Sequence, residues 1–165
     1  MAELTTLETK LAEVIGLAMA AQGATQKVER LVEKEQRDDL AGRLRLMREE
    51  ASEAEERGAE IAGRFEGKKT AILAEARSVK KKATEMMSDY LERNSDALDG
   101  FEFLTMAEAG EVGHWAVLGE LNKKARNRDV RELVLWQLPI QRRHFKEAQE
   151  GLLTLAREED PDATD

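Results

Sequence analysis

The clearest candidates for chemistry are a glutamate and a histidine in the second half of the chain. Glu111 and His114 are three residues apart, so a helix would place them one turn apart on the same face. Residues at alternating steps of three and four extend this face in both directions, and the full series is Leu104, Ala107, Glu111, His114, Leu118, Leu121 and Ala125. The pattern predicts a carboxyl group and an imidazole in the middle of a buried helix face.

The second histidine of the chain, His144, has a similar position in the next predicted helix. The corresponding series is Val130, Leu133, Gln137, Gln141, His144, Ala148, Gly151 and Leu155, and it is also polar in the middle. Buried groups of this kind need compensation, because water solvates them far better than an apolar interior does. Three compensations are open: a metal ion, partial exposure at a cleft, or a hydrogen-bonded network of Glu111 with both histidines and the two glutamines. Two imidazoles and a carboxylate suit a divalent transition metal.

Five helical segments would position these groups, and the composition does not favour strands. The predicted helices cover residues 4–32, 40–65, 72–90, 101–126 and 129–158. A break is expected at Gly67, because an uninterrupted helix from residue 38 to 93 would be about 80 Å long. We expect Asn, Ser, Asp and Gly in 94–100 to form a loop, Asp129 to cap the last helix, and Pro139 to kink it.

The third segment suggests how the chain is connected. The stretch of helix between the second and fourth predicted helices holds about 27 residues, or roughly 40 Å of helix, which is enough to carry the chain from one end of a bundle to the other. The second and fourth predicted helices would then run parallel. The alternative is a long coiled-coil arm in which the second and third segments fuse into one helix.

The second half of the chain resembles ferritin-like proteins of the rubrerythrin type and their uncharacterised bacterial relatives. The resemblance rests on Glu108, Glu111 and His114, then a short turn, Pro139, and the sequence from Gln141 to His144. It implies an all-α, ferritin-like four-helix bundle with a long helical crossover between the second and third bundle helices. In that family, carboxylates and Glu-x-x-His motifs on the bundle helices hold a diiron or dimanganese centre.

By this resemblance Glu111 matches a bridging carboxylate, Glu108 lies one turn before it, and His144 matches the histidine of the last helix. The sequence departs from the family pattern at Gln141, where a glutamate is expected, and in the second helix, which has no histidine. We therefore expect at most one iron or manganese ion, with Glu111, His114 and His144 as ligands and Glu108 either as an additional ligand or as a hydrogen-bonding partner of the ligands. Glu50 and Glu53 flank the buried face of the second helix and could reach inward.

Composition sets the remaining limits. The 165 residues are enough for one domain, expected at 1–158, followed by a disordered acidic tail at 159–165. The chain has no cysteine, which excludes thiol chemistry and disulfides. A net charge of −8 argues against nucleic-acid binding. Without a predicted membrane span or secretory signal, we expect a cytoplasmic protein that does not bind membranes and forms a homo-oligomer, with a dimer favoured.

Two functions follow from these observations. The first is a partly lost carboxylate and histidine metal site, with iron or manganese and an oxygen- or peroxide-linked redox role. The second is a non-enzymatic structural or interaction protein without a metal. The sequence identifies no catalytic residue, implies no organic cofactor, and gives Trp115 and Trp136 as anchors of a core or of a subunit interface.

Overall fold

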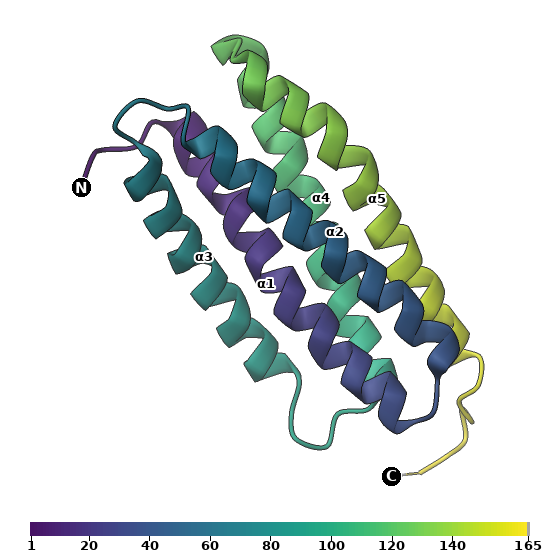
Figure 1. The fold of residues 1–165 in the computed structure, drawn as a ribbon. Helices are drawn as coiled ribbons and strands as arrows, with labels where there is room; N and C mark the ends of the chain where they lie inside the picture. Colours follow the sequence, from purple (N-terminus) through teal and green to yellow (C-terminus); the bar gives the residue numbers. More distant parts are fainter. Residues whose placement is uncertain (165) are drawn as a thin grey trace.

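The computed structural model describes residues 1–164 and consists of five α-helices (Figure 1). The helices are α1 (Thr6–Lys34), α2 (Asp38–Ala62), α3 (Lys69–Tyr90), α4 (Ala97–Ala125) and α5 (Arg128–Ala156). The all-helical class predicted from the sequence is confirmed, with no strand among the described residues. The last residue of the acidic tail predicted at 159–165 lies outside the described range.

Side chains that cap the first turn fix the starts of α1 and α4. Thr5 accepts a hydrogen bond from the backbone N–H of Glu8, whose side chain accepts one from the N–H of Thr5. Asp96 and Asp99 form the same reciprocal pair at the start of α4. The prediction of a loop over 94–100 is therefore wrong in its second half, because Asp, Ala, Leu and Gly there begin a capped helix.

The start of α5 also differs from the prediction. The side chain of Asn127, rather than Asp129, caps this helix by accepting a hydrogen bond from the backbone N–H of Val130 at 3.0 Å. Helix α5 continues through Pro139 and ends at Ala156, two residues before the predicted end. Such small differences arise because several polar residues near a turn can serve as the cap.

Helices α2 and α3 are separate. Residues 63–68 connect them, and Gly67 adopts a left-handed backbone conformation with φ of 70°. A residue with a side chain rarely adopts this conformation, so Gly67 allows the chain to turn where the sequence predicted a break. The alternative of one long fused helix is wrong.

Contacts at the helix ends fix the directions of the helices. The side chain of Glu35, after α1, accepts a hydrogen bond from the backbone N–H of Ala97 at 2.8 Å, so α2 and α4 begin at the same end of the molecule. At the other end, Arg64 pairs with Asp129 at 2.6 Å, which places the end of α2 beside the start of α5. Helices α2 and α4 therefore run parallel, and α3 returns along the outside of α1 (Figure 1).

Helix α3 packs closely on α1 only in its first half. At Gly16 a Cβ atom would lie against the backbone carbonyl oxygen of Ala76 and 2.7 Å from Cβ of Val79, so glycine allows the two helices to approach. The buried residues of α3 are Ala71, Ile72 and Ala76. The spacing of Ile72, Ala76, Val79, Ala83, Met86 and Tyr90 predicts a buried face along the whole helix. This prediction is wrong in the second half, since Met86 and Tyr90 are exposed.

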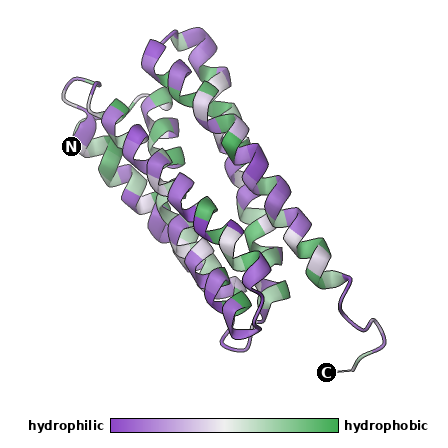
Figure 2. Cartoon of the chain, turned by 45° about the vertical axis from the view of Figure 1, so that its right-hand side comes forward, coloured by the Kyte–Doolittle hydropathy of each residue, from purple (hydrophilic) through white to green (hydrophobic). Residues whose placement is uncertain are grey.

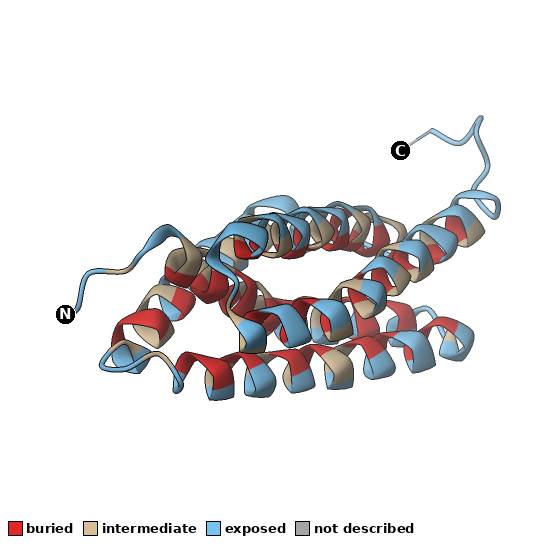
Figure 3. Ribbon diagram, turned by 90° about the horizontal axis from the view of Figure 1, so that it is seen from above, coloured by how far each residue is buried: buried red, intermediate tan, exposed pale blue. Residues whose placement is uncertain are grey.

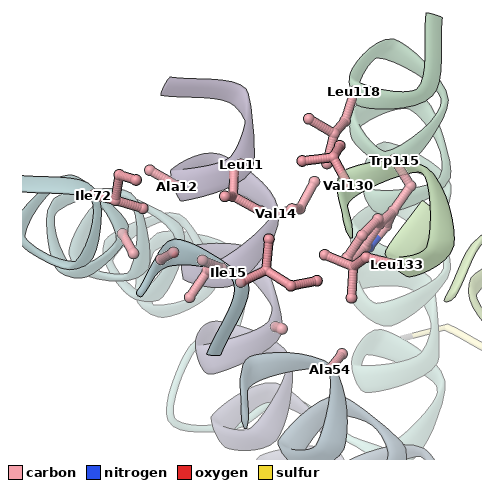
Figure 4. Close-up of a cluster of buried hydrophobic side chains, with 14 of the residues drawn as sticks. Leu11, Ala12, Val14, Ile15, Ala54, Ile72, Trp115, Leu118, Val130 and Leu133 are labelled. Carbon is pink, nitrogen blue, oxygen red and sulfur yellow. The ribbon is translucent and has the colours of Figure 1, made fainter. Parts of the chain in front are cut away.

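Hydrophilic and hydrophobic residues alternate in bands along the helices (Figure 2), and the buried residues lie on the faces turned toward neighbouring helices (Figure 3). They form two separate apolar clusters. The first lies toward the N-terminus of α1 and includes Leu11, Ile15, Trp115, Leu118 and Leu133 (Figure 4). The second lies toward the C-terminus of α1 and includes Val28, Leu44, Phe101, Leu104 and Leu155. The groups predicted to carry chemistry lie between these clusters.

None of the described helices combines the length and the apolar character needed to cross a membrane.

Candidate functional site

A polar layer separates the two apolar clusters in the middle of the molecule. It contains buried side chains from α1, α4 and α5, namely Thr25, Glu108, Glu111, Gln137, Gln141 and His144. The positions on α5 match the predicted series, because steps of four, three and four residues keep Gln137, Gln141, His144 and Ala148 on one helix face. The predicted polar interruption of the buried face is thus present in the folded chain.

His144 is the centre of this layer and is only 2% exposed. Its Nδ1 atom lies 3.6 Å from Oε2 of Glu108, and its Nε2 atom lies 3.4 Å from Oε1 of Glu50. Gln141 donates a hydrogen bond from its amide nitrogen to the same Glu108 oxygen. Gln137 donates in turn to Oε1 of Gln141 at 3.5 Å. These contacts connect α2, α4 and α5 through one polar network.

Glu50 enters the network from α2, whereas the neighbouring Glu53 does not. Glu50 pairs with both His144 and Arg143, so it compensates an imidazole inside the bundle and a guanidinium at its edge. Glu53 is exposed and pairs with Arg57 one turn along the same helix. Of the two glutamates expected to flank the buried face, only Glu50 reaches inward.

Glu111 and Glu108 both line a cavity beside the network. The cavity has a volume of about 240 Å³ and lies between α1, α3 and α4. Glu111 is 5% exposed, and no described residue forms a hydrogen bond with its carboxyl group. His114 lines the same cavity. Three of the four predicted site residues therefore share one cavity, and Glu108 connects it with the fourth, His144.

His114 itself turns away from the interior. Its side chain is 43% exposed, and Nδ1 lies 3.1 Å from Oε2 of Glu13 on α1. Glu13 also pairs with Lys10, which places the imidazole in a half-buried cluster of charges. The structure therefore does not bring the two histidines to a common partner, and the predicted place of His114 on the buried face of α4 is wrong.

The error arises because two neighbouring faces of α4 both fit alternating steps of three and four residues. The buried face of α4 follows the series Leu104, Glu108, Glu111, Trp115, Leu118 and Asn122. A step of three residues falls about 60° short of a full circle and a step of four passes it by about 40°. After Glu111, either His114 or Trp115 can therefore be the next residue of the buried face. The large indole ring of Trp115 is the signal in the sequence that favoured the observed face.

Two groups in the layer have altered proton affinities. Burial raises the pKa of Glu111 well above its usual 4.5, and the nearby charge of Glu108 raises it further. For His144, burial by itself lowers the pKa. The hydrogen bonds and negative charges of Glu108 and Glu50 outweigh it, so the pKa of the ring is raised above 6.5. Both groups therefore bind protons more tightly in the folded chain than in the unfolded chain.

We expect the free energy of unfolding to increase as the pH falls from about 8 to about 5.5, because protonation of His144 and Glu111 favours the folded state. The contribution of His144 is complete below 6.5 and is lost as the pH rises through its raised pKa. The contribution of Glu111 follows the same sign and is complete only below 4.5. Urea unfolding of the wild type and of Glu111→Gln and His144→Gln at both pH values measures the difference. Each variant should show a smaller pH dependence than the exposed control Glu102→Gln, and equal dependence in all four proteins would contradict the assignment.

The network does not form a ready metal site. The two nitrogens of an imidazole point in different directions, so Glu50 and Glu108, which face opposite nitrogens of His144, do not converge on one ion. Within residues 1–164, no group of three or more His, Asp or Glu side chains is gathered so that it could hold a metal ion. The residues present therefore do not fit the dinuclear centre that the family resemblance implies.

The chemistry visible in the layer is proton binding and hydrogen bonding. Glu108 holds Gln141 and His144, and Glu111 presents an unpaired carboxyl group to a cavity. Comparisons of the chain with protein-family models, with curated proteins and with solved structures found no significant match.

Proposed function

We propose that this protein is a ferritin-like four-helix bundle whose metal centre has been reduced to a hydrogen-bonded network, and that it is a non-enzymatic binding protein. The order of the elements supports the family proposal, because α1, α2, α4 and α5 surround a polar layer while α3 connects two parallel helices. Ferritin-like bundles have such a long connection and place their site in the middle of the helices.

The observation that carries the functional proposal is the set of partners of His144. Both ring nitrogens face carboxyl groups of the protein, and the Glu108 oxygen that faces Nδ1 also accepts a hydrogen bond from Gln141. Carboxyl groups at both nitrogens favour the doubly protonated ring, which has no lone pair for a metal ion. The network instead satisfies buried polar groups and connects three helices.

Metal analysis tests this proposal. Protein produced with added iron and manganese is analysed by inductively coupled plasma spectrometry after gel filtration. We expect the metal content to be far below one ion per chain, and equal in the wild type and in a Glu108→Ala/His144→Ala variant. A content of one ion per wild-type chain that is lost in the variant would overturn the proposal.

A second candidate is a single iron or manganese ion with a redox role toward oxygen or peroxide. The observation in its favour is that Glu108, Glu111 and His114 line one cavity. Binding would require the His114 ring to leave Glu13 and turn toward the two carboxyl groups. Loss of the ion in Glu111→Ala and in His114→Ala, but not in Glu102→Ala, would support this candidate.

Self-association is also part of the proposal. The exposed apolar side chains include Val117 on α4 and Leu135 on α5, which would be partly covered in a homodimer that uses these two helices. Light scattering of the wild type and of a Leu135→Glu variant would show whether a dimer forms and whether this face contributes to it.

A further inference from the structure

The cavity between α1, α3 and α4 has a chemical character that the polar network does not explain. Most of its lining is apolar, with Leu17, Ala20, Met87, Phe103 and Leu104 among the wall residues. Its volume of about 240 Å³ exceeds the roughly 150 Å³ that holds one benzene molecule in an engineered apolar cavity. It is smaller than the roughly 300–1,000 Å³ typical of sites for drug-sized ligands. The space therefore suits a small molecule with an apolar body.

The polar part of the cavity is acidic and has no counter-charge from lysine or arginine. Glu108 and Glu111 both reach it, and none of the described residues that line it is a lysine or an arginine. Glu108 is already engaged by Gln141 and His144, whereas Glu111 is 95% buried without a hydrogen bond from any described residue. The carboxyl group of Glu111 has no partner among the described residues and borders the cavity, so a donor or a cation that enters the cavity would satisfy it.

We propose that this cavity binds a small primary amine with an apolar body, whose ammonium group pairs with Glu111 and Glu108. The apolar walls favour such a molecule over a bare metal ion, because they supply buried surface that an ion does not use. This inference rests on the proposal that the protein is a metal-free binding protein and names the class of ligand.

The second half of α3 provides a route of entry. Met86 and Met87 line the cavity, and α3 has no fully buried residue beyond Ala76, so its last turns are less tightly packed than its first. The exposed fraction is 61% for Met86 and 50% for Met106, which lines the same cavity from α4. Flexible methionine side chains adapt to ligands of different shape, and a weakly packed helix end can move outward at small cost.

The six methionines provide a direct test. Met86, Met87 and Met106 line the cavity, whereas Met1, Met19 and Met47 do not. Hexylamine is titrated into the full chain labelled with ¹³C at the methionine methyl groups. We expect the methyl signals of the three cavity methionines to move and the other three to stay. Absence of movement, or equal movement with the uncharged 1-hexanol, would overturn the proposal.

Two variants test separately whether amine binding needs the charge of Glu111 and the open volume of the cavity. Glu111→Gln keeps the shape of the side chain and removes its charge, so the dissociation constant of hexylamine should increase by at least about tenfold. Gly110→Phe should block the cavity without a clash, since a Cβ atom at Gly110 would have no neighbour within 4 Å. Glu102→Gln, an exposed change on the same helix, should bind as the wild type does. Binding that is unchanged in both Glu111→Gln and Gly110→Phe would contradict the assigned site.

Manganese distinguishes this inference from the metal-binding candidate. If Mn²⁺ broadens the signals of Met86, Met87 and Met106 at one equivalent while hexylamine moves none of them, the amine proposal fails and the metal candidate gains. If the purified protein is metal-free and neither probe affects these signals, the ligand inference fails while the metal-free proposal stands.

Discussion

Replacement of Glu108 by alanine is expected to lower the free energy of unfolding by about 3–5 kcal/mol at about pH 6, where the buried His144 is charged. Glu108 is 1% exposed, lies 3.6 Å from Nδ1 of His144 and accepts a hydrogen bond from Gln141. Its removal leaves the Nδ1–H of the imidazolium and an amide N–H of Gln141 without a partner in the interior, while Glu50 still faces Nε2. Urea denaturation followed by circular dichroism measures the loss.

Three further variants make this result interpretable. Glu108→Gln keeps an acceptor for Gln141 and should lose less than Glu108→Ala. The exposed Glu102→Ala on the same helix should change stability by no more than about 0.5 kcal/mol. The Glu108→Ala/His144→Ala double variant should lose less than the sum of the single losses, because the two residues interact. A loss below about 1 kcal/mol in Glu108→Ala would show that the network contributes little to folding.

The Trp115→Ala variant is expected to lose about 3–5 kcal/mol, for a different reason. Trp115 is 1% exposed and belongs to the apolar cluster with Leu118, Val130 and Leu133 (Figure 4). Alanine would leave a cavity where α4 packs against α5. Thermal and urea unfolding of the variant, compared with the exposed control Val117→Ala, measures the effect.

The indole nitrogen allows the contribution of packing to be separated from hydrogen bonding. Nε1 of Trp115 is buried and has no hydrogen-bond partner among the described residues. Trp115→Phe removes this unpaired donor along with some volume, so it should be clearly less destabilising than Trp115→Ala. Equal losses in the two variants would show that the indole nitrogen has a partner in solution, such as a bound water molecule.

Helical periodicity was sufficient to predict most of the buried face in three of the helices. On α5 every position in the predicted series from Val130 to Leu155 is buried. On α1 and α2 the apolar residues at alternating steps of three and four are also buried, from Leu11 to Val32 and from Leu40 to Ile61. These helices each pack along their length against other helices, so a single apolar stripe describes them. The second half of α3 packs less closely, because a cavity separates it from α1 and α4, and Met86 and Tyr90 are exposed there.

The sequence by itself determined an all-helical chain, the break at Gly67, and a polar interruption of the core around Gln141 and His144. It did not determine which acid meets the histidine. Glu108 and Glu111 are one turn apart, and a small rotation of α4 about its axis decides which of them faces α5.

Only the tertiary structure decided this rotation, because it depends on how Trp115 packs against α5 while His114 pairs with Glu13 of α1. That rotation directs Glu108 to His144 and leaves Glu111 at the cavity under α3. The rotation of α4 depends on contacts between residues that are far apart in the sequence, and the spacing of residues within one helix carries no information about such contacts.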